Sequence, residues 1–281
     1  MKKFVLLSVC AVILAGCGNF DDKIPQITPI PSAQVTEAPT SSPTPTPTVN
    51  ISTLSTKVKG WGFVRKKGSA PEVPISYQEE LQKYGGYYLG DTGKKEIYLT
   101  FDEGYENGYT SKILDVLRDN NVPAAFFVTG PYLEGQQDLI QRMINEGHIV
   151  GNHTVHHPNL GECDEETIKS ELNELNKKCE ALYGISMRFM RPPEGAYSEQ
   201  SLAVTQSLGY KTILWSHAYK DWDVNFQPGT KNALDQVIPY FHNGEILLLH
   251  AVSKDNAEAL DEIIKTAREQ GYEFKSLTDL P

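Results

Sequence analysis

The sequence predicts an α/β fold in which parallel strands alternate with helices. Apolar runs typical of buried strands recur between stretches of helical periodicity, from residue 95 to the end of the 281-residue chain. Repeated β–α units imply right-handed crossovers, which close into a barrel or form an open doubly wound sheet. Polar residues also fall at or just after the expected strand ends, namely Asp102, His153, His157, Arg191, Asp221 and His250. In a barrel these ends converge on one mouth, where the chemistry takes place.

The expected elements follow one another in a regular order. Strands are expected over residues 95–101, 124–129, 148–152, 187–190, 212–216, 245–250 and 272–275. Helices are expected over residues 111–120, 138–146, 165–183, 199–208, 232–241 and 256–269. Gly147 ends the second helix. The third helix carries one apolar stripe at alternating spacings of four and three and is stopped by Gly184; the stripe consists of Ile168, Leu172, Leu175, Cys179 and Leu182.

The first 17 residues have the pattern of an export signal. A basic start, Met1-Lys2-Lys3, precedes an apolar run of about 11 residues, which is too short to span a bilayer. The run ends in Leu14-Ala15-Gly16-Cys17, which resembles the lipobox at which bacterial lipoproteins are cleaved and lipidated on cysteine. We therefore expect an extracytoplasmic lipoprotein anchored to the cell membrane through Cys17, facing the cell wall. An ordinary secretory signal is the alternative, and it also implies export.

Residues 18–60 are rich in Pro, Thr and Ser, and we expect a disordered tether there. At roughly 3.1 Å per residue such a tether holds a domain on the order of 100 Å from its anchor. Residues 61–281 are expected to form one catalytic domain. The net charge of −10, with no basic cluster beyond the first residues, argues against nucleic acid as a partner. Cys163 and Cys179 bracket a helix at a separation of roughly 20 Å, so we expect both to be unpaired.

The chemistry is carried by an acidic strand end and a pair of histidines. Asp102 and Glu103 close the first long strand, and His153 and His157 lie four residues apart, before Pro158. If that segment is helical, both imidazoles share one face and can bind one divalent ion. A carboxylate free to move protons beside such an ion provides the parts of a hydrolytic metal site.

Five motifs in order extend this pattern into a family resemblance. They are Thr100-Phe-Asp-Glu103, His153-Thr-Val-His-His-Pro158, Arg191-Pro-Pro-Glu-Gly195, Asp221-Trp222 and Leu247-Leu-Leu-His250. Their order and spacing resemble the polysaccharide deacetylases of carbohydrate esterase family 4, the NodB-homology domain. Within that family the chain is similar to the subgroup that deacetylates N-acetylmuramic acid of peptidoglycan for delta-lactam synthesis.

The resemblance implies a distorted (β/α) barrel with its active site at the C-terminal strand ends. It also implies a role for each matching residue. Asp102 would be the general base, kept ionised by Arg191. His250 would be the general acid that protonates the departing amine, oriented by Asp221. The backbone N–H of Glu194 would stabilise the oxyanion, and Trp222 would pack beside the acetyl methyl unless it is a core residue.

Two positions depart from the family pattern. Glu103 stands where most members have an aspartate that ligates the metal, so the histidines could hold the ion with Glu103 or with water alone. Glu194 stands where the subgroup often has a basic side chain, which leaves the preference for acidic wall substituents open. The resemblance implies a divalent metal, with zinc favoured and cobalt, manganese or magnesium as alternatives.

Together these features predict a monomeric, metal-dependent hydrolase that removes N-acetyl groups from peptidoglycan glycan strands. N-acetylmuramic acid is the expected substrate, in a delta-lactam pathway of the spore-cortex type, hence a link to sporulation. Deacetylation of N-acetylglucosamine in wall glycan or chitin-like oligosaccharides is the alternative. A glycan-binding lipoprotein without activity is a further alternative, although the intact acid, base and histidine positions argue against it.

Overall fold

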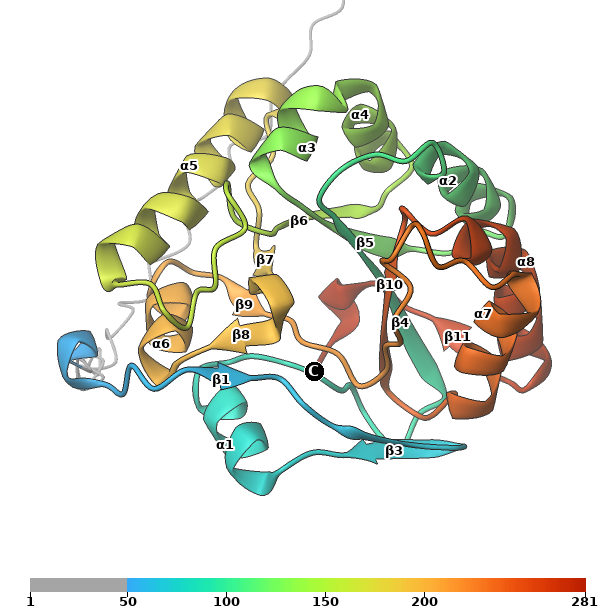
Figure 1. Ribbon diagram of the computed structural model, residues 1–281, viewed down its shortest axis with the longest axis horizontal. Helices are drawn as coiled ribbons and strands as arrows, with labels where there is room; N and C mark the ends of the chain where they lie inside the picture. The colour runs from blue at the N-terminus through green and yellow to red at the C-terminus, as the bar shows by residue number, and fades with distance from the viewer. Residues whose placement is uncertain (1–49) are drawn as a thin grey trace, which may run out of the picture. The chain divides into compact units, whose positions relative to one another are not determined.

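The computed structural model describes residues 50–281, drawn in colour in Figure 1. The expected signal segment, with Cys17, and most of the expected tether lie outside the described residues. The first described element is a short 3-10 turn, Ile51–Thr53. Within the described part of the chain, no helix is both long and apolar enough to cross a membrane.

A curled parallel sheet forms the centre of the domain. Its strands follow in the order β10 (Glu245–His250), β4 (Glu96–Glu103), β5 (Ala124–Val128), β6 (Ile149–Asn152), β7 (Phe189–Met190) and β9 (Lys211–Thr212), and β11 (Glu273–Phe274) also pairs with β4. Beyond β9 the chain reaches back to β10 through a parallel bridge between His217 and Leu247, which closes the curl. The predicted distorted (β/α) barrel is confirmed.

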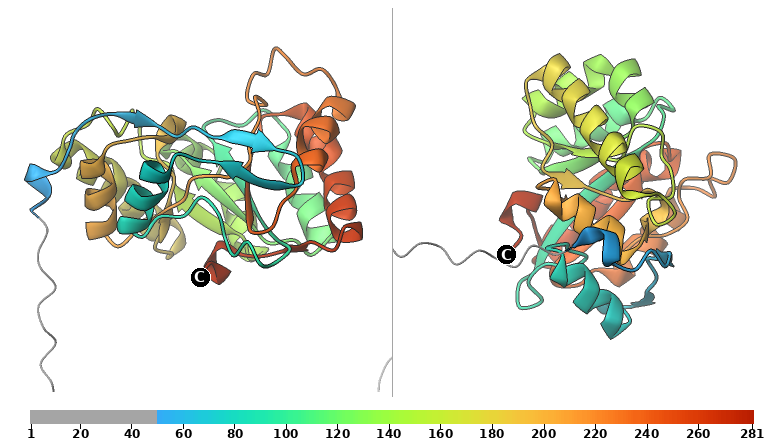
Figure 2. Two further views of the ribbon diagram at one scale, coloured as in Figure 1. Left: turned by 90° about the horizontal axis from the view of Figure 1, so that it is seen from below. Right: turned by 90° about the vertical axis from the view of Figure 1, so that its left-hand side faces the viewer.

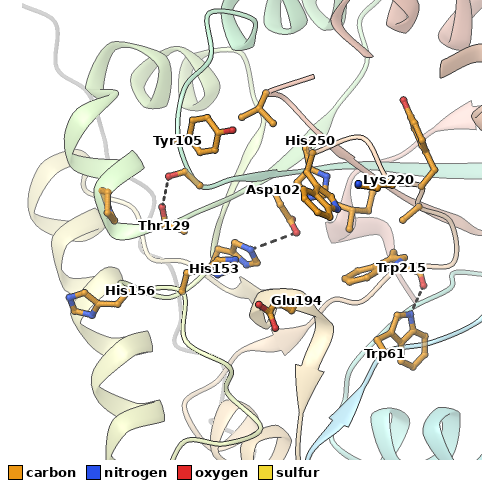
Figure 3. Close-up of a pocket in the computed structure, with 18 of the residues that line it drawn as sticks. Trp61, Asp102, Tyr105, Thr129, His153, His156, Glu194, Trp215, Lys220 and His250 are labelled. Atoms are coloured by element: carbon orange, nitrogen blue, oxygen red, sulfur yellow. Dashed lines mark hydrogen bonds and ion pairs between the residues drawn. The ribbon is translucent and has the colours of Figure 1, made fainter. Parts of the chain in front are cut away.

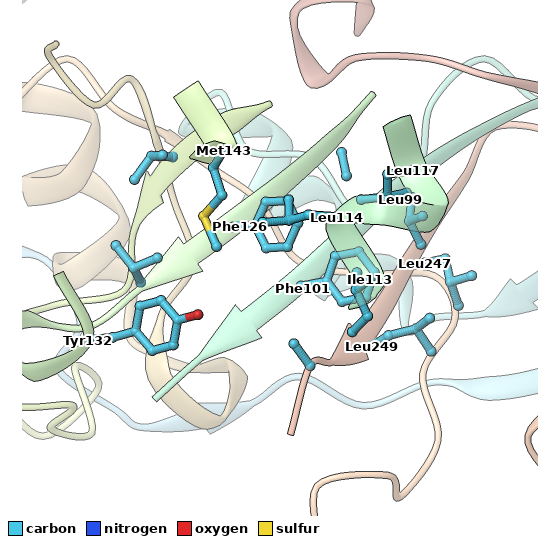
Figure 4. Close-up of a cluster of buried hydrophobic side chains, with 14 of the residues drawn as sticks. Leu99, Phe101, Ile113, Leu114, Leu117, Phe126, Tyr132, Met143, Leu247 and Leu249 are labelled. Atoms are coloured by element: carbon cyan, nitrogen blue, oxygen red, sulfur yellow. The ribbon is translucent and has the colours of Figure 1, made fainter. Parts of the chain in front are cut away.

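Helices cover the outside of this sheet (Figure 1). They are α2 (Thr110–Asp119), α3 (Gly130–Gly135), α4 (Gln137–Asn145), α5 (Glu165–Tyr183), α6 (Glu199–Ser207), α7 (Thr230–Val237) and α8 (Lys254–Glu269). Leu99 and Phe101 of β4 pack with Ile113 of α2 in the main hydrophobic core (Figure 4). Because side chains alternate along a strand, Thr100 and Asp102 point to the opposite face, into the barrel. Phe101 stacks on Phe126 with ring centroids 5.0 Å apart.

The longest helix, α5, follows the expected pattern at both ends. Asp164 caps its first turn by accepting a hydrogen bond from the Thr167 backbone N–H, and Gly184 ends it in the left-handed conformation, with φ 70°. The first four members of the expected apolar stripe are buried, but Leu182 is 45% exposed. The stripe therefore stops one turn before the helix does.

Two elements are shorter than the sequence predicted. The expected helix 232–241 is α7 followed by a 3-10 turn, Ile238–Tyr240. Pro239 explains the change, because it lacks the N–H that another α-helical turn requires. The expected strand 212–216 is reduced to β9 and to the single bridges made by Ile213 and His217. Within residues 50–281, Cys163 and Cys179 are both free, as predicted.

A segment before β4 that the periodicity did not predict packs against one side of the barrel (Figure 2). It contains β1 (Lys59–Gly60), β2 (Val64–Lys66), β3 (Ser69–Glu72) and α1 (Ile75–Lys83). Strand β1 pairs antiparallel with β8 (Ala196–Tyr197). Next to it, the Trp61 backbone N–H donates to the Gly195 carbonyl at 2.9 Å. This pairing brings Trp61 to the edge of the barrel mouth.

Candidate active site

A cleft of about 1150 Å³ opens at the C-terminal ends of the barrel strands. Figure 3 shows side chains from distant parts of the chain converging on it. Of the residues predicted to form the site, the cleft is lined by Asp102, His153, His157, Glu194, Trp222 and His250. The structure thus brings together most of the predicted set, with Arg191 and Asp221 directly behind it.

Asp102 and Arg191 form a buried ion pair at the base of the cleft. Arg191 follows the short strand β7, and its Nη1 lies 2.7 Å from Asp102 Oδ1. The remaining guanidinium donors are also used, Nη2 on Thr100 Oγ1 at 2.9 Å and Nε on the Ile213 carbonyl at 3.0 Å. Burial alone would raise the pKa of Asp102, but Arg191 and the nearby histidines outweigh it and hold this pKa below its usual value. Asp102 is therefore ionised, as a general base must be.

His153 and His157 lie next to each other in the wall of the cleft, with one ring edge-on to the other. Their ring centroids lie 4.9 Å apart with planes at 77°. The segment is a loop and not a helix, because Thr154 and His157 adopt left-handed φ values of 68° and 59°. The condition of a helical segment is therefore not met, although the two imidazoles still lie next to each other. Thr154 Oγ1 accepts the His157 backbone N–H at 3.0 Å and stabilises this loop.

The tautomer of His153 follows from its neighbour. Its Nδ1 lies 2.8 Å from the Arg191 carbonyl oxygen, so Nδ1 carries the proton and donates it. The lone pair of Nε2 is then free, and Nε2 lies 3.7 Å from Asp102 Oδ2. Burial lowers the pKa of His153 to about 4, which keeps the ring neutral near pH 7.

Glu103 is not brought to the histidines. Its side chain is completely buried and does not line the cleft, and among residues 50–281 neither carboxyl oxygen has a hydrogen-bond partner. The alternation of β4 explains this, because Glu103 lies on the same side as Phe101, two positions earlier, and opposite Asp102. Burial, with Glu106 and Asp102 nearby, raises the pKa of Glu103 well above its usual value. In this conformation Glu103 belongs to the outer layer, and burial favours its protonated form.

His250 is held from behind by Asp221. Asp221 Oδ1 lies 2.7 Å from His250 Nδ1, and Oδ2 accepts the His250 backbone N–H at 2.8 Å. Asn256 at the start of α8 donates to the same Oδ2 at 2.5 Å. Burial would lower the pKa of His250, but the Asp221 carboxylate outweighs it and raises this pKa above its usual value. The pair therefore favours imidazolium, the form that donates a proton.

Glu194 and Trp222 lie on the cleft surface. Glu194 is exposed and adopts a left-handed φ of 59°, an uncommon conformation for a side chain with a Cβ. Trp222 is 55% exposed, so it is a surface of the cleft and not a core residue. Trp61 and Trp215 add further aromatic surface, and Trp61 Nε1 donates to the Trp215 carbonyl at 2.8 Å.

Several residues of the site were missed by sequence reasoning. Asn256 and Thr100 are ordinary polar residues whose positions relative to Asp221 and Arg191 only the fold reveals. Trp61 lies far from the motifs in sequence and reaches the cleft only through β1. Lys220 lines the cleft directly before the Asp221-Trp222 motif, which was the one signal that could have identified it.

The donor set fits a weakly held divalent ion. In residues 50–281 no group of three or more His, Cys, Asp or Glu side chains is arranged to hold a metal. Two imidazoles do converge, however, and the free Nε2 of His153 faces a carboxylate beside the cleft. Imidazole suits zinc and neighbouring transition metals better than magnesium. The protein would then supply two ligands, and water or substrate the others.

The fold and cleft define a class of protein: a hydrolytic (β/α)-barrel domain with a paired base, a paired acid and two converging histidines. Residues 89–213 match the family model described as polysaccharide deacetylase. The chain is 47% identical over 222 residues to the peptidoglycan-N-acetylmuramic acid deacetylase PdaA of Bacillus subtilis, covering 78% of this chain and 84% of that protein. It is 32% identical to a peptidoglycan-N-acetylglucosamine deacetylase of Bacillus cereus, and the match covers 74% of this chain and 75% of that protein.

Solved structures agree with these relatives. The structure of Bacillus subtilis PdaA, a family 4 carbohydrate esterase, superposes with a TM-score of 0.79 at 46% identity and covers 81% of this chain and 98% of that one. The structure of a family 4 carbohydrate esterase from Bacillus anthracis gives a TM-score of 0.69 at 46% identity, and the match covers 81% of this chain and 97% of that one. The chain belongs to the polysaccharide deacetylase family, carbohydrate esterase family 4. The resemblance stated from the five motifs is confirmed.

Proposed function

We propose that this protein hydrolyses the N-acetyl amide of peptidoglycan amino sugars, with N-acetylmuramic acid as its substrate. One observation carries the proposal. An ionised carboxylate, Asp102, and a histidine poised as an acid, His250, line the same cleft, each fixed by a buried partner of opposite charge. Amide hydrolysis needs this combination, because a proton must leave the attacking water and another must reach the departing amine.

Asp102 accepts the proton of the attacking water. Its pairing with Arg191 keeps it ionised near neutral pH but also weakens it as a base, so the water itself must be made more acidic. A divalent ion on His153 and His157 would supply that effect by lowering the pKa of a bound water. His250 then donates its proton to the amine nitrogen, and Asp221 stabilises the imidazolium until it does so. The Glu194 backbone N–H is our proposed donor to the oxyanion.

The two-histidine ligand set is tested by metal analysis. Replacing either His153 or His157 by alanine should abolish bound zinc, whereas His156→Ala should retain it. His156 is the matched control because it lies in the same loop but pairs with Glu171, at 2.7 Å between Nδ1 and Oε1. Equal zinc content in all three variants would refute the ligand assignment. Loss of zinc in a Glu103 variant would return that acid to the ligand set.

Muramic acid is favoured because PdaA, a protein named for that activity, is 47% identical to this chain. One observation supports the alternative, N-acetylglucosamine. Glu194 places an exposed carboxylate on the cleft surface, and it would repel the lactyl carboxylate that distinguishes muramic acid. The two acid–base pairs, Asp102 with Arg191 and His250 with Asp221, would serve the hydrolysis of either sugar's acetamido group.

Mass spectrometry of digested peptidoglycan separates the two sugars. Purified wall glycan should be treated with enzyme before and after enzymatic removal of the stem peptides. We expect the acetyl group to be lost from muramic acid, and more completely once the peptides are gone. Loss confined to glucosamine would refute the proposed substrate, and loss from neither sugar would favour a glycan-binding protein without activity.

The cellular setting is also a proposal. We propose that Cys17 carries a lipid and holds the catalytic domain outside the membrane, beside the glycan strands that it deacetylates. Incorporation of a labelled fatty acid, lost in Cys17→Ala, tests the anchor. We further propose that the domain acts as a monomer and serves delta-lactam formation during sporulation. Light scattering of purified protein and muropeptide analysis of spores from a deletion strain test these two points.

A further inference from the structure

The charges on the cleft surface are few and unevenly placed. Among the residues that line it, Lys220 is the sole lysine or arginine. Arg191 lies beneath the surface and is fully buried against Asp102. The exposed acid of the lining is Glu194, which comes from the turn after β7. Lys220 comes from the loop between β9 and α7, on the side of the cleft where His250 lies (Figure 3).

Two neighbouring side chains contact the ammonium of Lys220. Its ammonium lies 5.0 Å from the ring centroid of Trp222 and 3.2 Å from Asp223 Oδ2. Asp223 is held in turn, because its Oδ1 accepts the Asn225 backbone N–H at 3.1 Å. The ammonium is thus pre-positioned, yet its side chain remains 58% exposed and able to meet a ligand.

The loop itself is tied to the catalytic acid. Asp221, which holds His250, is the next residue after Lys220. The Gln227 side-chain amide donates through Nε2 to the backbone carbonyls of Asp221 and Asp223, at 3.2 and 3.0 Å. Its Oε1 accepts a hydrogen bond from the Ser253 hydroxyl, just before α8, at 2.8 Å. The cation is therefore carried by the same hydrogen-bonded loop that positions the proton donor.

Muramic acid carries a lactyl carboxylate that would lie near His250 and Lys220 when the sugar is bound. Its lactyl ether sits on the ring carbon next to the one that carries the acetamido group. When His250 protonates the amide nitrogen, the lactyl carboxylate must therefore lie close to the catalytic groups. Glu194 would repel it on one side of the cleft, and Lys220 is the one permanent cation among the lining residues that can receive it.

We propose that Lys220 binds the lactyl carboxylate of the substrate sugar and so determines specificity for muramic acid with a free lactyl group. This inference rests on the proposed function. The existing contact with Asp223 does not oppose it, because an exposed ion pair contributes little and exchanges readily for a substrate carboxylate. A lactyl group blocked by a stem peptide would lose the interaction.

The test uses glycan chains freed of stem peptides, in two forms. In one form the lactyl groups are free carboxylates, and in the other they are converted to primary amides. Acetate release is measured with the wild-type protein, Lys220→Met, Lys220→Arg and the control Lys231→Met. Lys231 suits the control because it is 86% exposed and pairs with Asp235 on α7, and it does not line the cleft. Methionine keeps the aliphatic packing on Trp222 while removing the charge.

We expect Lys220→Met to raise KM for the carboxylate form about tenfold, the effect of losing one charged hydrogen bond, with kcat changed little. KM for the amide form should stay within about twofold of wild type, and Lys220→Arg should restore most of the loss. Glu194→Gln should lower KM for the carboxylate form alone. The Lys231 variant should match wild type throughout.

Other outcomes separate the inference from the function beneath it. An equal rise in KM for both forms would overturn the inference, because Lys220 would then support the loop and not bind the anion. A wild-type protein that deacetylates both forms equally well would also overturn it, while leaving the proposed function intact. Acetate release from glucosamine chains but from neither muramic form would overturn the proposed substrate, and the inference with it.

Discussion

Replacing Glu103 by methionine should stabilise the protein and leave its chemistry intact. Glu103 is completely buried, and neither of its carboxyl oxygens has a hydrogen-bond partner in the described part of the chain. Leaving a buried polar group unpaired costs about 1–3 kcal/mol, and the flexible, apolar methionine side chain avoids this cost in nearly the same volume. We therefore expect the free energy of unfolding to rise by about 1–3 kcal/mol at pH 4.

The gain should grow as the pH rises. Below the ordinary pKa of 4.5 the acid is neutral in both the folded and the unfolded chain. Above it, the unfolded chain releases a proton that folded Glu103 retains, because burial raises its pKa. Each pH unit in that window then costs the wild type about 1.4 kcal/mol, until the pH passes the folded-state pKa. The stability added by Glu103→Met should increase over the same window.

Urea unfolding of both proteins between pH 4 and 8 measures this difference. Glu106→Met is the matched control, since Glu106 accepts hydrogen bonds from the Gly108 N–H at 2.5 Å and from the Tyr132 hydroxyl at 3.2 Å. That variant should be destabilised. A Glu103→Met protein that is less stable than wild type at every pH, or that loses bound zinc, would refute the reasoning and indicate that the acid turns into the cleft.

Three further changes probe the site. Asp221→Asn should lower kcat/KM by about 10²–10⁴ and move the alkaline limb of the pH profile to lower pH, because the carboxylate that raises the pKa of His250 is gone; an unmoved limb would argue that His250 is not the acid. Arg191→Lys should move the acidic limb to higher pH, since one ammonium cannot replace three guanidinium contacts and the pKa of Asp102 then rises. Trp61→Phe should cost about 1 kcal/mol of stability through the lost Nε1 hydrogen bond and raise KM, measured by urea unfolding and acetate release; an unchanged KM would separate Trp61 from substrate binding.

Much of the fold could be predicted from the sequence because the long strands and helices have clear local patterns of apolar residues. Strand β4, helix α5 and strand β10 carry uninterrupted apolar runs or a clear helical stripe, and capping residues such as Asp164 and Gly184 mark the ends. Short strands such as β1 and β8 offered no such signal. They exist because neighbouring segments supply their hydrogen bonds, which is a tertiary effect that local periodicity does not record.

The candidate site followed the same division. Asp102, Arg191 and His250 were found because they stand in motifs at strand ends, and the pairing of Asp102 with Arg191 could be stated in advance. The loop geometry at His157 could not, because a left-handed conformation at a non-glycine residue depends on surrounding contacts. The orientation of Glu103 could not be predicted either, because the strand was expected to end at residue 101. In the structure β4 continues to residue 103, and the alternation of side chains along it turns Glu103 away from Asp102.

The role of Asp102 as the base is tested by comparing acetate release from peptide-free peptidoglycan by wild type and Asp102→Asn. Asp119→Asn serves as the control, because Asp119 is an exposed partner of Arg118 on α2. We expect rapid release from muramic acid residues by wild type and control, and a fall of about 10²–10⁴ in rate for Asp102→Asn in a folded protein that still binds glycan. Release that persists undiminished in Asp102→Asn would contradict the assignment of the base and, with it, the proposed chemistry of the cleft.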